Sequence, residues 1–346
     1  MRVLVTGATG FVGGRLVPSL LQRGHEVVSL VRDPADYDAP PGVTVVEADL
    51  LEPATLDDPL ADVDAAYYLV HSMDDGSEDF AERDRRAARN FAQAASAGAV
   101  ERVVYLSGLG EESDDLSKHL QSRREVEHVL GEGDYDLTVL RAAVIVGSDS
   151  ASFQLIRQLV ERLPVMVTPR WVRNDCQPIG IEDALEYLVG VLGAPETAGG
   201  TYEIGGPDVL TYQAMLRRTA AALGRTLFIV PVPVLSPKLS AYWLDLVTTM
   251  PRSITHPLVA GLRNPVVVND DSIREHVDVD LTPFDETVRR ALGADAVGLA
   301  PPGPDTADAD ADPHSNANPN PKPETDTTAE TDGGRPAAAD AADRDE

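Results

Sequence analysis

The stretch TGATGFVGG, residues 6–14, decides the fold class of this chain of 346 residues. It follows the apolar run MRVLV and precedes apolar positions that recur with helical spacing up to residue 22. Gly7 permits a sharp turn, Gly10 lets the backbone approach a pyrophosphate closely, and Gly13 lets a helix press on a sheet. The stretch therefore predicts a strand, a turn and a helix over residues 9–22 whose N-terminus binds nucleotide phosphates.

Beyond this turn, apolar segments alternate with helical patterns as far as residue 147. Continuous apolar strands separated by helices are typical of a parallel sheet that is covered on both faces. The sequence thus predicts an α/β fold, a Rossmann-type doubly wound parallel sheet with right-handed crossovers. The strands are expected at residues 1–7, 25–32, 43–49, 65–72, 101–109 and 136–147, and further helices at 80–98 and 119–133.

The pattern changes after the dinucleotide-binding core expected at residues 1–150. Residues 151–300 mix helices with short strands such as TYEIGG (201–206), which predicts a smaller α+β substrate lobe interleaved with the core. Residues 301–346 are rich in Pro, Asp, Ala and Thr and have almost no large apolar residues, so we expect a disordered acidic tail.

The formal net charge of −28 argues against nucleic acid as a partner. Lysine occurs only at Lys118, Lys238 and Lys322, and this acidic, lysine-poor composition indicates a halophilic protein in a high-salt cytoplasm; the alternative is an ordinary acidic protein. No signal peptide and no run of 18 apolar residues is present, so a cytoplasmic location without a membrane span is expected. The segment 227–250 comes nearest to such a run, but prolines and two charged residues interrupt it.

The end of the second expected strand, LVRDP, bears on the choice of nucleotide. NAD-specific sites usually carry an acidic residue at this point, whereas here Arg32 comes first. A guanidinium pairs with a 2′-phosphate, which favours NADP(H) over NAD(H); alternatively, Arg32 stacks on the adenine without selecting the phosphate. Asp49, at the end of the third expected strand, is either an adenine contact or a cap for the helical segment that follows.

The opening TGATGFVGG, ADL at 48–50 and LSG at the end of the fifth strand resemble atypical short-chain dehydrogenase/reductase families that bind NAD(P)H. AYYLVHSM (66–73) and HLQSRREVE (119–127), with YWLDLVT (242–248) and PLVAGLRNPVVV (257–268), resemble the NmrA-like subgroup related to an accessory subunit of respiratory complex I. The resemblance covers residues 1 to about 290. The cofactor contacts predicted from the motif and the resemblance are Gly7, Thr9, Gly10, Phe11, Val12, Gly13, Arg32, Asp49, Leu50, Val70, His71 and Arg123.

Catalytic members of these families use a Ser or Thr on the fifth strand and a YxxxK pair on the next helix. The resemblance assigns the first role to Ser107, but His119 and Arg123 give HxxxR in place of YxxxK. Positions i and i+4 share a helix face, so the pair can still act together. An adjacent guanidinium lowers the pKa of an imidazole, which suits a neutral His119 that donates a hydrogen bond better than a protonated acid. Alternatively, His119 and Arg123 only position the cofactor. No metal ligands are predicted.

The sequence therefore predicts an oxidoreductase acting on a small carbonyl or quinone-like substrate. Two alternatives stay open: a dinucleotide sensor or assembly factor without turnover, and an epimerase acting on a sugar nucleotide. A respiratory complex or a second copy of the chain remains open as a partner.

Overall fold

The computed structural model describes residues 1–71, 80–110, 118–231, 248–261 and 265–293. They all belong to a compact unit that runs from Met1 to Leu299. The expected disordered tail lies outside the described residues, and the domain boundary at residue 150 stays a prediction. Among the described helices, none combines the length and the apolarity needed to cross a membrane.

A seven-stranded sheet forms the centre of this unit, with strand order β11-β6-β5-β4-β1-β2-β3. Every neighbouring pair of strands in it is parallel, which confirms the predicted α/β fold. The chain order reverses between β1 and β4, and ligands bind at the carboxyl ends of the strands at such a switch point. The strands are β1 (Arg2–Thr6), β2 (Glu26–Val31), β3 (Val43–Glu47), β4 (Ala65–Tyr68), β5 (Arg102–Gly108), β6 (Asp136–Ala142) and β11 (Thr201–Ile204).

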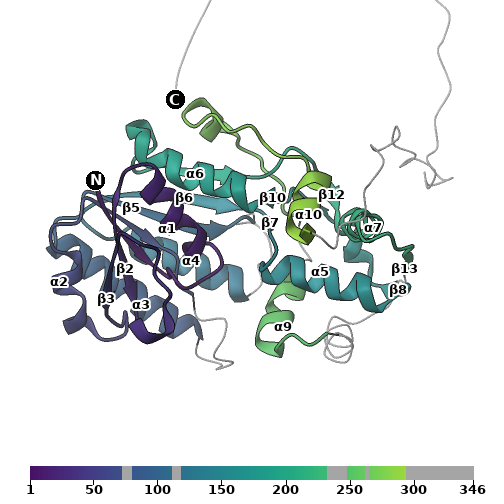
Figure 1. The fold of residues 1–346 in the computed structure, drawn as a ribbon, viewed down its shortest axis with the longest axis horizontal. Coiled ribbons are helices and arrows are strands. Elements are labelled where there is room, and N and C mark those ends of the chain that lie inside the picture. The colour runs from purple at the N-terminus through teal and green to yellow at the C-terminus, as the bar shows by residue number, and fades with distance from the viewer. Residues whose placement is uncertain (72–79, 111–117, 232–247, 262–264, 294–346) are drawn as a thin grey trace, which may run out of the picture. The chain divides into compact units, whose positions relative to one another are not determined.

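Helices cover both faces of the sheet. Neighbouring residues of a strand point to opposite faces, so both faces carry apolar side chains that the helices bury. Tyr67 points toward one face, where its hydroxyl donates to the Leu188 carbonyl at 2.6 Å. Tyr68 points toward the other, where its ring packs edge-on against Phe91 with ring centroids 5.1 Å apart. Figure 1 shows α6 and α3 on opposite sides of the sheet. The first face is covered by α1 (Gly13–Gln22) and α6 (Ile181–Gly193), the second by α2 (Asp57–Leu60), α3 (Phe80–Ala97) and α4 (Lys118–Leu130).

Two elements differ from the sequence prediction. The strand in TYEIGG was expected in the smaller lobe, but β11 pairs in parallel with β6 and forms an edge of the main sheet. The crossover helix α6 brings the chain back over the α1 face, so this strand ends next to β6. The first helix was expected from residue 9, but it begins at Gly13 because residues 7–12 form the turn itself.

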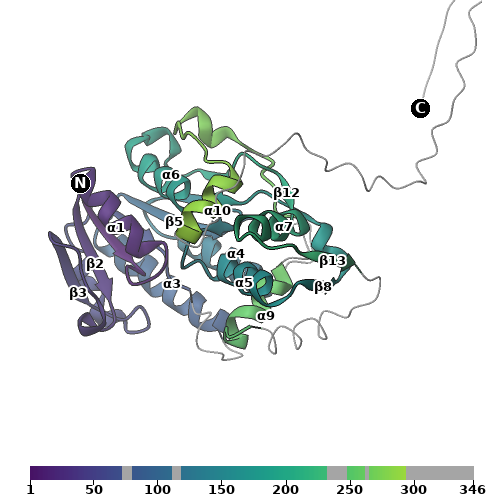
Figure 2. The same cartoon turned by 45° about the vertical axis from the view of Figure 1, so that its right-hand side comes forward.

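The smaller lobe has a core of its own, in which Phe153, Met215 and Val288 are fully buried. Its short strands pair two by two rather than forming one sheet. In both ribbon views, β8 and β13 lie together at the end of the lobe that is farthest from β2 and β3 (Figures 1 and 2). The elements are β7 (Ile145–Val146) with β10 (Ile179–Gly180), β9 (Asp175–Cys176) with β12 (Leu210–Thr211), β8 (Val165–Thr168) with β13 (Phe228–Pro231), and helices α5 (Ala151–Arg162), α7 (Tyr212–Ala222), α9 (Arg252–Gly261) and α10 (Phe284–Leu292).

Candidate dinucleotide and substrate site

The turn between β1 and α1 presents unpaired backbone N–H groups. The Gly10 N–H donates to the Gly7 carbonyl at 3.0 Å and closes the turn. The N–H groups of Phe11, Val12 and Gly13 have no acceptor among the described residues, and no side chain caps α1. Free N–H groups and the positive end of a helix dipole together make a site for phosphate groups.

The glycines of this turn fit the close approach that a diphosphate requires. A Cβ on Gly13 would lie 2.2 Å from the Gly7 carbonyl oxygen, and a Cβ on Gly7 would lie 2.9 Å from the Leu69 carbonyl oxygen. The Thr6 hydroxyl donates to the Tyr67 carbonyl at 3.0 Å and accepts from the Leu69 N–H at 3.2 Å. It thereby joins the carboxyl ends of β1 and β4 at the switch point, directly beside the turn.

Phe11 and Thr9 complete the turn in different ways. Thr9 is exposed, whereas the Phe11 ring packs against Gly147, where a Cβ would come within 2.8 Å of it. The Arg15 guanidinium lies 4.5 Å from the centroid of the Phe11 ring and forms an ion pair with Asp149 at 2.6 Å. The first helix is thus tied to the segment after β7, a contact that no sequence pattern indicated.

At the end of β2, the two charged residues have different surroundings. The Asp33 carboxylate accepts the Ala35 N–H at 2.9 Å and caps the short helix Pro34–Asp36. Arg32 is exposed and makes no hydrogen bond or ion pair with the part of the chain that the structure describes. The Asp33 carboxylate is therefore engaged in a hydrogen bond to its own loop, whereas the Arg32 guanidinium is available to a ligand.

Asp49 and Leu50 follow β3 in a tightly bonded turn. The Asp49 carboxylate accepts the Leu51 N–H at 2.9 Å, and the Asp49 N–H donates to the Thr55 hydroxyl at 3.1 Å. The Asp49 carboxylate thus bonds within its own turn, whereas the short helix Pro53–Thr55 that follows has Glu52 at its N-cap and no side-chain cap. The Leu50 side chain is buried in the core, and the Asn90 amide donates to the Leu50 carbonyl at 2.8 Å.

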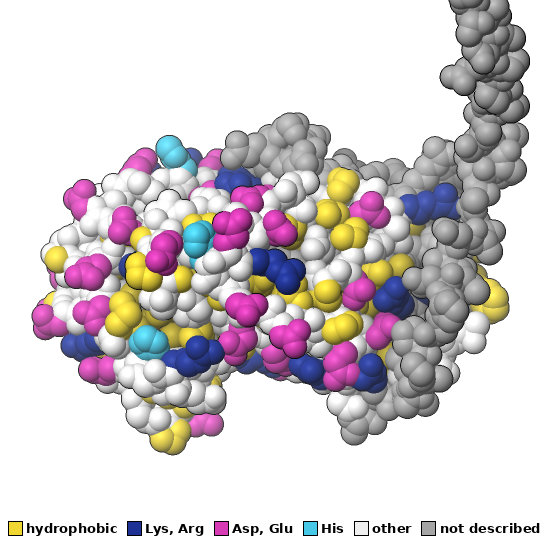
Figure 3. All heavy atoms as spheres, turned by 90° about the horizontal axis from the view of Figure 1, so that it is seen from above, with side chains coloured by type: hydrophobic (Ala, Val, Ile, Leu, Met, Phe, Trp, Pro, Cys, Tyr) yellow, Lys and Arg dark blue, Asp and Glu magenta, His cyan; other side chains and the backbone are white. Residues whose placement is uncertain are grey.

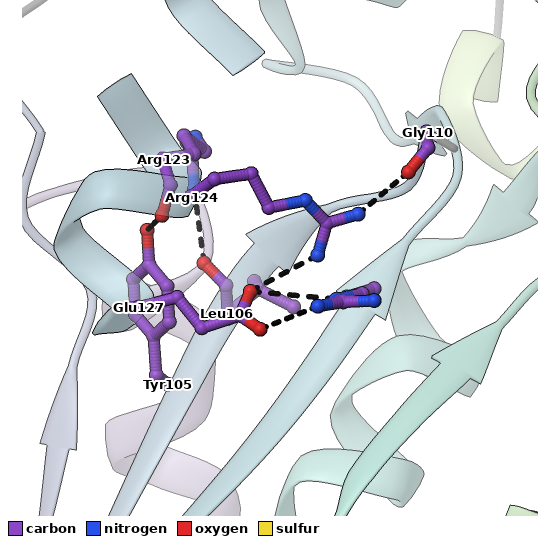
Figure 4. Close-up of polar contacts among 7 residues, drawn as sticks. Tyr105, Leu106, Gly110, Arg123, Arg124 and Glu127 are labelled. Atoms are coloured by element: carbon purple, nitrogen blue, oxygen red, sulfur yellow. Dashed lines mark hydrogen bonds and ion pairs between the residues drawn. The ribbon is translucent and has the colours of Figure 1, made fainter. Parts of the chain in front are cut away.

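The predicted catalytic residues come from β5 and α4. Ser107 lies at the carboxyl end of β5, on the same side of the sheet as Tyr105 and α4, and is almost fully buried. Its hydroxyl has no hydrogen-bond partner among the described residues. Arg123 donates from Nη1 to the Leu106 carbonyl at 2.9 Å, which holds α4 against this strand end (Figure 4). A buried hydroxyl without a partner is costly, so it is well placed to bind a ligand oxygen.

His71 and His119 lie close to each other, and their ring centroids are 6.0 Å apart in an edge-on arrangement. Burial, followed by the charge of Arg123, lowers the pKa of His119 to about 3. His71 is exposed, yet desolvation, Arg123 and His119 lower its pKa below its usual value as well. Both rings are therefore neutral near pH 7. Val70, the residue before His71, packs against the core on the α3 side of the sheet.

An ion network that the sequence analysis missed anchors α4. The Glu127 carboxylate accepts from Arg124 at 3.1 Å and from Arg141 of β6 at 2.5 Å, and Arg124 also donates to the Gly110 carbonyl at 2.6 Å. These three side chains are only 15–18% exposed. Figure 4 shows Arg124 spanning from Glu127 to Gly110 across the end of β5. The i,i+3 spacing of Arg124 and Glu127 is visible in the sequence, but the third partner comes from another element.

A small cavity of about 60 Å³ opens beyond the carboxyl ends of β5 and β11. It adjoins the ion network through Gly110, and Glu203 is the one charged side chain among the described residues that line it. The lining residues are Leu109, Gly110, Glu203, Pro265, Val267 and Asn269.

The low pKa of His119 predicts a specific loss of stability in acid. The unfolded chain binds a proton at this residue below about pH 6.5, whereas the folded chain does so only below about pH 3, so stability falls as pH drops through this window. When the pH falls from about 7.5 to about 5, the unfolding free energy of the unmodified chain should decrease. The decrease should be smaller in His119→Gln, by up to about 2 kcal/mol. Urea unfolding of both proteins at the two pH values measures this. An equal loss in both would show that His119 titrates normally in the folded state.

Comparison with known proteins supports an NAD(P)H-binding domain in the first part of the chain. Residues 7–163 match the profile of a family described as NAD(P)H-binding, which supports an NAD(P)H-binding domain there. The chain is 28% identical to an uncharacterized protein of Mycobacterium tuberculosis over 251 residues, or 72% of this chain and 26% of that protein. The chain thus spans about a quarter of the length of this relative.

Two solved structures share the fold. Citrobacter sp. triphenylmethane reductase, complexed with NADP(H), has a TM-score of 0.69 and 19% identity over 84% of this chain and 100% of that chain. The Escherichia coli NADPH-dependent quinone oxidoreductase, complexed with NADPH, has a TM-score of 0.65 and 22% identity over 83% of this chain and 98% of that chain. The chain therefore has the Rossmann-type fold found in NAD(P)H-binding reductases.

Proposed function

We propose that this protein is an NADPH-dependent reductase of a quinone-like or similarly conjugated acceptor, whose reduction requires no strong acid from the protein. The observation that carries the proposal is that Arg123 links these groups: it holds the end of β5, where the Ser107 hydroxyl has no partner among the described residues, and its charge acts on the neutral rings of His71 and His119. These groups can donate hydrogen bonds to an oxygen that becomes negatively charged, but they hold no readily released proton near pH 7.

A reduced nicotinamide, when bound, supplies the hydride, and the protein orients it. The unpaired N–H groups of Phe11, Val12 and Gly13 would hold the diphosphate. Ser107 would donate a hydrogen bond to the substrate oxygen, and His119 would donate a second one from its neutral ring. The reduced oxygen then takes its proton from water, since the pKa of His119 is too low for imidazolium to form.

Arg123 has a positioning role in this proposal. It anchors α4 through the Leu106 carbonyl, and its charge adds to desolvation in lowering the pKa of both imidazoles. Its remaining N–H groups, which have no acceptor among the described residues, are available to ribose hydroxyls.

The names of two structural neighbours agree with this class of acceptor. One is called a triphenylmethane reductase and the other an NADPH-dependent quinone oxidoreductase. At identities of 19% and 22% these likenesses carry only the fold, so the proposed substrate class rests on the residues of this chain.

Arg32 is expected to select NADPH over NADH. Its unpaired guanidinium would bind the 2′-phosphate, so NADPH should bind at least about tenfold tighter than NADH, and Arg32→Ala should abolish the difference. Fluorescence titration with both nucleotides measures the two dissociation constants. Arg23→Ala is the matched control, because Arg23 is exposed and pairs with Glu186 away from this strand end. The preference should shrink at high salt. Equal affinities in the unmodified chain would refute NADPH selection.

The proposed activity is tested by an NADPH-oxidation screen with quinones and aldehydes, preceded by an absorbance scan of the purified protein. Quinone-dependent oxidation whose rate shows no histidine titration between about pH 5 and pH 8 is the expected result. Binding of NADPH without oxidation by any acceptor would favour the sensor or assembly factor. Nucleotide that copurifies tightly and shows no net oxidation would favour the epimerase.

A further inference from the structure

The strands β8 and β13 form a two-stranded ribbon with one apolar, solvent-exposed side. The parallel register places Phe228 beside Val165 and Val230 beside Val167. These four side chains, the apolar ribbon face, are 48–62% exposed. The residue between the two valines of β8, Met166, points to the opposite side and is buried in the core of the lobe.

The concentration of apolar side chains on this ribbon is unusual for the molecule. Single exposed apolar residues are normal on a protein surface, whereas a contiguous group marks an interaction site. Among the described residues, six large hydrophobic side chains are exposed, and four of them form the apolar ribbon face. The sequence that continues from β13 has the same character, since only Lys238 and Asp245 are charged between residues 227 and 250.

The sequence segments that contain the two strands of the ribbon are net positive, whereas the whole chain is acidic. Residues 151–174 contain four Arg and one Glu, and residues 209–252 contain four Arg, one Lys and one Asp. These segments therefore carry net charges of +3 and +4 in a chain of net charge −28. Acidic side chains are spread over the face of the molecule shown in Figure 3.

Three exposed arginines lie close in sequence to the two strands of the ribbon. Arg162 and Arg225 each stand three residues before the first apolar position of a strand, so both lie at the same end of the parallel ribbon. Arg173 follows β8 and has no hydrogen bond or ion pair within the described residues. An apolar surface bordered by guanidinium groups is complementary to a layer that is anionic outside and apolar beneath.

We propose that the apolar ribbon face docks on the surface of an anionic lipid bilayer. The four apolar side chains enter the boundary between headgroups and acyl chains, while Arg162, Arg225 and Arg173 contact lipid phosphates. The acidic remainder of the molecule is repelled by the same surface, which fixes the orientation of docking. A symmetric dimer through this face is disfavoured, because it would bring the flanking arginines of two copies together.

This docking does not depend on the proposed reaction, although it would bring the site near acceptors dissolved in the bilayer. The test is co-sedimentation with vesicles of phosphatidylcholine alone and of phosphatidylcholine mixed with phosphatidylglycerol. The chain should bind the anionic vesicles more tightly than the neutral ones. The double variant Val167→Ser/Phe228→Ser should bind at least about tenfold more weakly, because it loses the apolar contact. Arg162→Gln/Arg225→Gln should remove most of the dependence on salt.

Val209→Ser is the matched control, because Val209 is 52% exposed but lies outside the ribbon. NADPH affinity, measured for every variant, shows whether its fold is intact. Absence of binding to anionic vesicles, or equal binding by the double ribbon variant, would overturn the proposal. Self-association that the double variant abolishes, without any vesicle binding, would assign the face to a second copy of the chain instead. NADPH oxidation with a water-soluble quinone in the absence of vesicles tests the reaction separately.

Discussion

Gly13→Ala is expected to weaken NADPH binding by at least about 100-fold, which corresponds to roughly 3 kcal/mol. A Cβ at this position would lie 2.2 Å from the Gly7 carbonyl oxygen and 2.8 Å from its carbonyl carbon. Both are backbone atoms of the turn that is proposed to hold the diphosphate, so relief of the clash must move the N–H groups of Phe11 and Val12. Titration of NADPH by fluorescence and the melting temperature with and without NADPH measure the effect.

Gly14→Ala is the control for this prediction. The nearest atom to its added Cβ, the Ala8 carbonyl oxygen, is 3.5 Å away, which is an ordinary contact. Gly14 lies in the first turn of α1, where alanine is favoured over glycine by up to about 1 kcal/mol, so stability should be unchanged or slightly higher. Comparable NADPH affinities for the two alanine variants would show that the turn does not bind the diphosphate.

Ser107→Ala should lower kcat for quinone reduction by about 100-fold and leave NADPH affinity unchanged. Removal of one hydrogen-bond donor to a developing oxyanion typically has an effect of this size. Because the Ser107 hydroxyl has no partner among the described residues, its loss should not destabilise the fold. Steady-state kinetics, together with a thermal melt, separate a catalytic effect from a structural one.

Tyr105→Phe is the matched control, since Tyr105 lies on the same strand and the same side of the sheet. Its hydroxyl donates to the Arg123 carbonyl at 3.3 Å, and burial raises its pKa, so it should be dispensable for turnover. A large loss of kcat in Tyr105→Phe with normal kcat in Ser107→Ala would transfer the role to the tyrosine.

Local sequence signals predicted the turn after the first strand and the main sheet, because both features depend on residues that are close together in the sequence. The glycine triplet and the alternation of apolar strands with helices are readable within about ten residues. The α/β fold was confirmed on this basis. The helix start was wrong by four residues, since the pattern does not distinguish the turn, whose N–H groups stay unpaired, from the first helical turn.

Contacts between distant elements were not predictable in the same way. His71 and His119 were both candidates, but their pairing depends on how α4 lies over β4 and β5. The contact of Glu127 with Arg141 joins two elements that no sequence pattern relates. The pairing of β11 with β6 was not predicted, because a four-residue strand carries no information about its partner.

The return of the chain through α6 and β11 has a consequence for how the polypeptide can be divided. A fragment that ends near residue 150 would lack α6, so the Tyr67 hydroxyl would lose the Leu188 carbonyl and part of one sheet face would be bare. It would also leave β6 with an unpaired edge, open to association with other chains. The nucleotide-binding half is therefore completed by sequence that follows it. The smaller lobe is formed by segments that lie before and after α6 and β11 in the chain, so it cannot be separated from the sheet by a single cut.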